Sequence, residues 1–300
     1  MASGPLFDVY CVVDWSANAT PKRGADSIWV SEFSGETTPG HEPAAVNLPT
    51  RHAAHAHLRD LIERHTGRRV LIGFDFPLGY PEGFAAAARL AGAQPWQATW
   101  HYLAAHLTDD ERNRNNRWAV AAGLNQRIGE LRYWGAPVRR AGQHLTSRRP
   151  EGDAPRTLRH TEVALRSHTG RPPFTVWQLL GAGSVGSQTL TGIPVVHRLC
   201  ASPRVMVWPF RSGFTADPCA GRVDAVVVAE VWPSIVEADD VLPKDRGQVL
   251  ALARHFATLD RAGGLGELFA PDLPAWVAAA AVAEEGWVLG AASKVRQETS

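Results

Sequence analysis

The sequence predicts an α/β fold in which a mixed β-sheet is flanked by helices. Three short apolar runs each end at an acidic residue: residues 9–13 precede Asp14, residues 70–74 precede Asp75, and residues 225–229 precede Glu230. Such runs are typical of strands buried on both faces, and open α/β sheets bind ligands at the carboxyl ends of their strands. We therefore expect the three acids to gather at one edge of the sheet.

The order of the elements indicates which strands are neighbours. After the first strand we expect a strand over residues 27–33, a weaker strand near 44–48 and a helix over 51–65, which Thr50 caps and Gly67 ends. Antiparallel strands followed by a helical crossover place the first and fourth strands side by side and parallel. Asp14 and Asp75 are then expected to be neighbours.

From residue 78 the pattern changes from strands to helices and loops. Helices are expected over residues 85–91, 96–107 and 117–131, the sheet resumes at 204–208, and helices over 247–262 and 273–289 complete the chain. Between residues 139 and 171 lie eight arginines against three acids. We therefore divide the chain into a discontinuous α/β core, residues 1–77 and 203–300, and a mostly helical, basic insertion, residues 78–202.

The composition excludes several classes of protein. The chain has 300 residues, 45% of them apolar, and a formal net charge of +1, which argues against wholesale electrostatic binding to nucleic acid or membranes. The three widely spaced cysteines, Cys11, Cys200 and Cys219, are typical of reduced thiols. No signal peptide and no bilayer-spanning apolar run is visible. We expect a cytoplasmic protein without a membrane partner.

Carboxylates grouped in this way suit a divalent metal site. Mg²⁺ and Mn²⁺ prefer carboxylate and water ligands, and two such ions about 4 Å apart activate water and stabilise the leaving oxygen in phosphoryl transfer. The alternative is that each acid only closes its strand and hydrogen-bonds nearby backbone. Three acids in this order favour the metal site, with Asp14, Asp75 and Glu230 as ligands.

Five motifs flank the predicted insertion: residues 13–16 (VDWS), 73–79 (GFDFPLG), 230–234 (EVWPS), 244–249 (KDRGQV) and 284–287 (EEGW). They resemble the ribonuclease H-like superfamily, and more closely an uncharacterised bacterial branch of predicted ribonuclease H-like nucleases. The resemblance implies a ribonuclease H-like sheet whose acids on the first and fourth strands, Asp14 and Asp75, bind Mg²⁺ or Mn²⁺. It extends this role to Glu230.

In the superfamily a further acid usually comes from a late helix, and the resemblance leaves a choice between Asp245 and Glu284. An acid from the first helix is also common, but Asp60 and Glu63, the candidates here, fit a solvated face better. The insertion is larger than the minimal fold needs. The resulting catalytic set is Asp14, Asp75, Glu230 and Asp245, and the resulting metal set is Asp14, Asp75, Glu230 and Glu284.

A glycine-rich segment, residues 181–186, matches the dinucleotide-binding pattern G-x-G-x-x-G and follows the strand-like residues 174–180. A Rossmann site is disfavoured, because the following helix would meet Pro194 after barely two turns and no acid stands about 20 residues further on. Two interpretations remain. The segment is either a tight loop whose amides face an anion, or plain packing of glycines. In the first interpretation the donors are Ser184, Ser187 and Gln188.

Several polar and basic residues are candidates for binding an anionic substrate. The arginine-rich stretch could follow a phosphate backbone, receive a smaller anion, or be a solvated face. Arg159 is one candidate, although its spacing from Glu162 also suits a structural helical pair. Lys22 and Lys244 each lie close to an acid-bearing segment, and Ser16 follows the first strand. These side chains complete the predicted substrate-binding set.

These observations predict a metal-dependent hydrolase, a nuclease or phosphoesterase, acting on an anionic phosphorylated or nucleic-acid substrate. The alternative is a non-catalytic module that binds a nucleotide, a metabolite or a protein in the same pocket. Metal-dependent turnover separates these two hypotheses. An actin-like kinase is a third possibility, but its phosphate loop needs a glycine soon after the first aspartate, and none follows Asp14 closely.

Overall fold

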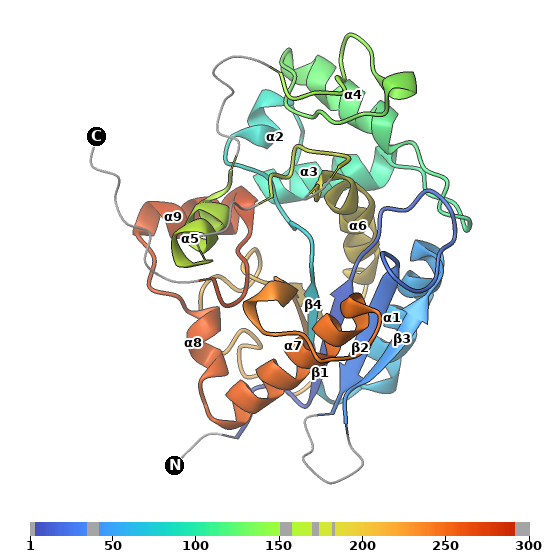
Figure 1. Ribbon diagram of the computed structural model, residues 1–300. Coiled ribbons are helices and arrows are strands. Elements are labelled where there is room, and N and C mark those ends of the chain that lie inside the picture. Colours follow the sequence, from blue (N-terminus) through green and yellow to red (C-terminus); the bar gives the residue numbers. More distant parts are fainter. Residues whose placement is uncertain (1–3, 35–41, 151–157, 170–173, 182–183, 292–300) are drawn as a thin grey trace.

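The computed structural model describes residues 4–34, 42–150, 158–169, 174–181 and 184–291. In these residues a mixed sheet lies between helical layers (Figure 1). The strands are β1 (Val9–Asp14), β2 (Ile28–Phe33), β3 (Ala44–Leu48), β4 (Arg69–Phe74), β5 (Val205–Val207) and β6 (Ala225–Glu230), in the order β3-β2-β1-β4-β6-β5. The predicted α/β class, with helices on both sides of a mixed sheet, is confirmed.

The predicted neighbours among the strands are also confirmed. β1 pairs antiparallel with β2 and parallel with β4, and β4 pairs parallel with β6. In this register Val13 lies opposite Phe74, which in turn lies opposite Glu230. Parallel neighbours end at the same edge of a sheet, so the acids that end these strands lie at one edge.

The two faces of the sheet are covered by different helices. The helices are α1 (Arg51–Arg64), α2 (Phe84–Ala87), α3 (Pro95–His106), α4 (Arg117–Ile128), α5 (His160–Thr169), α6 (Gly186–Leu199), α7 (Lys244–Arg261), α8 (Leu265–Phe269) and α9 (Ala275–Ala280). Short 3₁₀ turns span Val138–Arg140 and Pro233–Ile235, and a π-helical turn spans Ala281–Glu285. Successive residues of a strand face opposite sides. Cys11 and Val13 therefore pack with α1, α3, α4 and α6, and Tyr10 and Val12 with α7.

The helix predicted after the third strand forms as expected. Thr50 has an extended backbone, and its hydroxyl accepts a hydrogen bond from the Ala53 amide at 3.1 Å. This bond satisfies one of the first amides of α1, which have no partner inside the helix. The helix ends at Arg64, and Gly67 follows in a left-handed conformation at φ +82°.

Three expectations for the later elements were wrong. Residues 174–180 do not form a strand, and the last predicted helix ends at Glu285 instead of residue 289. The helix after the glycine-rich segment does not stop at Pro194, because α6 continues to Leu199. Nearly every residue of α6 from Gly186 to Val196 is buried, so tertiary packing outweighs the cost of about 3 kcal/mol for a proline inside a helix.

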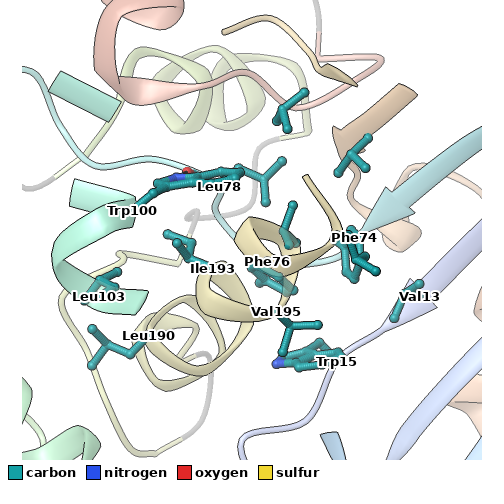
Figure 2. Packing of buried hydrophobic residues seen from close by; sticks show 14 of the residues in the cluster. Val13, Trp15, Phe74, Phe76, Leu78, Trp100, Leu103, Leu190, Ile193 and Val195 are labelled. Atoms are coloured by element: carbon teal, nitrogen blue, oxygen red, sulfur yellow. Dashed lines mark hydrogen bonds between the residues drawn. The ribbon is translucent and has the colours of Figure 1, made fainter. Parts of the chain in front are cut away.

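Helix α6 is a central part of the core, although it lies in the predicted insertion. Figure 2 shows Ile193 and Val195 of α6 beside Phe74, Phe76 and Val13. A Cβ atom at Gly192 would overlap the ring of Phe76, so only glycine allows this close approach. The contact fixes the chain directly after Asp75 against α6. Within the described residues, no helix is long and apolar enough to cross a membrane.

Candidate functional site

Two aspartates lie side by side where β1 and β4 end. Asp14 is the last residue of β1, and Asp75 follows β4 directly. The Asp75 amide donates to the Val13 carbonyl at 3.2 Å, and Asp75 Oδ1 accepts from the Trp15 amide at 2.7 Å. The two carboxyl groups are hydrogen-bonded to each other. The strand register and the backbone around Asp75 therefore hold the acid pair together.

The environment of this pair favours the protonated form. Burial, followed by the nearby charges of Asp75, Asp245 and Asp26, raises the pKa of Asp14 well above its usual range. Burial also raises the pKa of Asp75 to about 6, although hydrogen bonds from Asp14 and the Trp15 amide oppose the shift. Two carboxyl groups this close cannot both ionise without a cation. The pair therefore shares a proton, which Asp14 donates to Asp75.

Asp245, at the start of α7, is the third acid of the site. Its Oδ2 atom accepts a hydrogen bond from the Asp26 amide at 2.7 Å, which ties the loop after β1 to α7. Its charge raises the pKa of both Asp14 and Asp75, so the three carboxyl groups are close. A carboxylate in the first turn of a helix is stabilised by the helix dipole. Of the two late acids that the sequence left open, the structure brings Asp245 to the pair.

A cavity of about 580 Å³ opens beside these acids. This volume lies within the range of about 300–1,000 Å³ that is usual for small-molecule sites. The side chains that matter below are among its lining residues: Asp14, Ser16, Asp26, Arg117, Ser184, Ser187, Gln188 and Asp245. Three predicted substrate-binding residues, Ser16, Ser184 and Gln188, thus share one cavity with the predicted catalytic acids Asp14 and Asp245.

The wall formed by the loop after β1 is held by hydrogen bonds. Arg51 of α1 is buried, and its Nη1 atom donates to the carbonyls of Ser16 at 3.0 Å and Asn18 at 2.8 Å. The Ser16 hydroxyl donates to the Asp26 carbonyl at 3.1 Å. Arg51 and Ser16 therefore keep this loop in place, and the donor proton of Ser16 is already used within the loop.

Glu230 and Arg159 lie in a buried ion pair. Arg159 Nη1 and Nη2 donate to Glu230 Oε2 at 2.7 Å and Oε1 at 2.6 Å, and Arg159 Nε donates to Glu162 Oε1 at 2.7 Å. Glu230 Oε2 also accepts from the Leu78 amide at 3.1 Å. We expected Glu230 to bind metal and Arg159 to bind substrate. The structure does not match these expectations, because the two side chains bind each other. The structural pairing of Arg159 with Glu162 is observed.

The carboxylate of Glu284 is also bound to other groups of the protein. Its two carboxylate oxygens accept hydrogen bonds from the amides of Gly83 at 2.7 Å and Ala85 at 2.6 Å, at the start of α2. The next residue, Glu285, accepts from the amide and the imidazole of His160 at the start of α5. The π-helical turn thus directs consecutive acids to two helix N-termini. The structure does not bring Glu284 to the Asp14–Asp75 pair, in contrast to its predicted role as a metal ligand.

The remaining predicted lysines lie outside the cavity lining. Lys22 pairs with Asp26 at 3.1 Å on the surface, and Lys244 is exposed at the start of α7. The sequence analysis did not single out Asp26 or Arg117, which do line the cavity. Nothing in the sequence distinguishes Arg117 from the many other arginines, because its special position arises from the packing of α4 near the loop after β1.

The donor set fits a divalent cation that keeps water ligands. Within the described residues, no group of three or more histidine, cysteine, aspartate or glutamate side chains is arranged to enclose a metal ion. Mg²⁺, however, is usually held by one or two carboxylates, with water and substrate phosphates completing its coordination. Asp14 and Asp75, which share a proton next to an open cavity, meet this requirement.

Comparison with known proteins found no relatives. No protein-family model matches the chain, and neither a curated protein nor a solved structure matches it. The function therefore has to be inferred from the geometry and chemistry of the site.

Proposed function

We propose that this protein is a divalent-metal-dependent hydrolase that cleaves a phosphoester bond at the Asp14–Asp75 pair. The observation that carries the proposal is the pair itself, which consists of two hydrogen-bonded carboxyl groups at the ends of adjacent parallel strands, next to a cavity. A pair with strongly raised pKa values in a cleft is a usual sign of a functional site.

The chemistry of the pair favours a cation over a purely structural role. Asp14 donates its shared proton to Asp75, and the acid Asp245 is close to both. A divalent cation on the pair would replace this proton and offset the repulsion among the carboxylates. When bound, Mg²⁺ or Mn²⁺ would polarise a phosphoryl oxygen and lower the pKa of a water ligand.

Each side chain of the site has a role in this proposal. Asp14 and Asp75 would hold the ion. Asp245 Oδ2 is occupied by the Asp26 amide, which leaves Oδ1 to accept a hydrogen bond from water and to take up its proton. Trp15 and Phe76, which directly follow Asp14 and Asp75 in the chain, are buried and would exclude bulk water from that side of the pair. The Trp15 amide keeps Asp75 oriented.

A ribonuclease H-like assignment is part of the proposal. It is supported by the position of Asp14 and Asp75 on the first and fourth strands, which are parallel neighbours, and by antiparallel pairing of the first three strands. These are the two positions that the sequence resemblance assigns to metal ligands. The absence of Glu230 and Glu284 from the pair leaves Asp245 as the third acid.

Binding and turnover are tested separately. We expect isothermal titration calorimetry to detect Mn²⁺ binding to the wild type at about pH 7.5, and at least about tenfold weaker binding to Asp14→Asn and Asp75→Asn. The matched control is Asp272→Asn, since Asp272 is exposed and lies outside the cavity lining. Circular dichroism checks that each variant is folded.

Hydrolysis of p-nitrophenyl phosphate and bis-p-nitrophenyl phosphate then tests turnover. We expect cleavage that requires Mn²⁺ or Mg²⁺ and is lost in both pair variants. A folded wild type that binds neither ion refutes the metal site. Metal binding without turnover of any phosphoester would support the second candidate, a non-catalytic ligand-binding module, which the cavity beside Asp14 also suits.

A further inference from the structure

Arg117, the first residue of α4, is a buried arginine on the wall of the cavity. Its side chain is 7% exposed, and it lines the same cavity as Asp14 and Asp245. Nη1 donates to Asn115 Oδ1 at 2.9 Å, and Cζ lies 4.4 Å from the centroid of the Trp118 ring. The buried Nε atom has no hydrogen-bond partner in the described part of the chain. Within the described residues, most of the guanidinium donors therefore have no protein acceptor.

Among the described residues, no acid forms an ion pair with Arg117. The nearby carboxylate is Asp109, and both of its oxygens bind Arg51, at 2.5 and 2.7 Å. Burial and the neighbouring Arg51 lower the pKa of Arg117 to about 10, against the opposing charge of Asp109. The two other buried arginines both have acid partners, Arg51 with Asp109 and Arg159 with Glu162 and Glu230. An unbalanced buried cation next to an open cavity is a receptor for an anion.

The N-terminus of α6 lies on the same wall. Ser187 and Gln188, in the first turn of this 14-residue helix, line the cavity. No side chain caps the helix, and none of the described residues accepts a hydrogen bond from the Ser187 or Gln188 amide. The side chains are engaged elsewhere, Ser187 with the Leu179 carbonyl and Gln188 with the Trp15 carbonyl. Amides without an acceptor among the described residues, together with the positive end of the helix dipole, favour anion binding.

We propose that Arg117 and the N-terminus of α6 bind a phosphate group of a small, nucleotide-sized phosphorylated molecule. This proposal rests on the proposed function, because it names the substrate class of that site. The cavity then has two different walls. Asp14 and Asp245 form the acidic wall, with Asp75 bonded to Asp14 behind it, and this wall would hold the metal ion. Arg117 with α6 forms the anion-binding wall.

The charges of the cavity select a small substrate over a nucleic-acid strand. Arg117 is the only basic residue among the described residues that line the cavity, and the acids Asp14, Asp26 and Asp245 line it as well. Binding along a nucleic-acid backbone needs a series of lysines and arginines that each neutralise a phosphate. One buried arginine, one helix N-terminus and about 580 Å³ of space fit a single phosphate and its attached group.

The test separates the anion-binding wall from the metal wall. Calorimetry measures binding of inorganic phosphate and of adenosine monophosphate to the metal-free protein, and binding of Mn²⁺ alone in a second titration. We expect Arg117→Met to weaken phosphate and nucleotide binding at least about tenfold, with Mn²⁺ affinity unchanged. Arg117→Lys, which keeps the charge but loses the planar fork, should bind with intermediate affinity.

Arg114→Gln is the matched control. Arg114 lies three residues before Arg117, but it is exposed and pairs with Asp110 at 2.6 Å on the surface. We expect its phosphate affinity to equal that of the wild type. Arg117→Met removes a charge without leaving a buried acid unpaired, because Asp109 keeps both bonds to Arg51. Thermal unfolding monitored by circular dichroism checks that this variant is folded.

Each outcome has a distinct meaning. If folded Arg117→Met binds phosphate as tightly as the wild type, Arg117 is structural and the anion-binding wall is refuted, whereas unchanged Mn²⁺ binding leaves the proposed function intact. Arg117-dependent phosphate binding without any Mn²⁺ binding supports the anion site and refutes the metal site. If an oligonucleotide of about 12 nucleotides binds far more tightly than the mononucleotide, with a steep salt dependence, the small-substrate proposal is refuted.

Discussion

Protonation of Asp75 in the buried Asp14–Asp75 pair predicts an unusual dependence of stability on pH. Folding raises the pKa of Asp75 from its ordinary value of 3.8 to about 6. The folded state therefore binds this proton more tightly than the unfolded state. Its stabilising effect is complete below about pH 4 and is lost as the pH rises through 6. The pKa of Asp14 is raised as well, so the loss continues to higher pH.

The magnitude follows from the pKa difference of Asp75. The step from 3.8 to about 6, at 1.36 kcal/mol per pH unit, corresponds to about 3 kcal/mol of unfolding free energy. Asp75→Asn removes this pH-dependent contribution to the unfolding free energy, because an amide does not titrate. In this variant the side-chain amide oxygen can still accept a hydrogen bond from the Trp15 amide, and the side-chain NH₂ group can donate to Asp14. The variant should therefore gain at least about 3 kcal/mol relative to the wild type between about pH 4 and pH 8.

Urea unfolding followed by circular dichroism, with a chelator present, measures this difference. Asp272→Asn, an exposed aspartate, should show no pH-dependent gain over the wild type. Mn²⁺ at about 100 times its dissociation constant should then stabilise the wild type at pH 8 by about 2.7 kcal/mol and leave Asp75→Asn unchanged. A stability difference between Asp75→Asn and wild type that is constant with pH would show that folding does not raise the pKa of Asp75, and the reasoning would be wrong.

Two further predictions concern the residues that hold the site. Glu230→Gln should lower the unfolding free energy by about 3–5 kcal/mol, because the buried Arg159 then loses the negative charge of this partner. Chemical denaturation measures this change. A decrease in unfolding free energy below about 1 kcal/mol would contradict the buried ion pair. Gly192→Ala should cost about 1–3 kcal/mol, because the added methyl group overlaps the Phe76 ring. Gly123→Ala in α4, where the space is open, should instead be neutral or stabilising. Equal melting temperatures for the two glycine variants would refute the packing argument.

Local patterns in the sequence predicted much of the sheet. Apolar runs identified the three buried strands β1, β4 and β6, and the order of elements identified β1 and β4 as parallel neighbours. Helix α6, which contains Pro194, was predicted less well, because a propensity argument weighs only the local cost of proline. The burial of α6 between the sheet and the helices around it exceeds that cost.

The sequence by itself determined the acid pair of this protein. Asp14 and Asp75 each follow a strand, and the pairing of those strands is a consequence of local patterns and short connections. Only the tertiary structure decided which other charged side chains are available. Glu230 is bound by Arg159, 71 residues away, and Glu284 by amides about 200 residues away. Arg117, by contrast, has no acid partner among the described residues, and its Nε atom has no acceptor there. The physical reason is that the availability of a charge depends on the partners that folding brings to it, and residues far apart in the chain supply those partners.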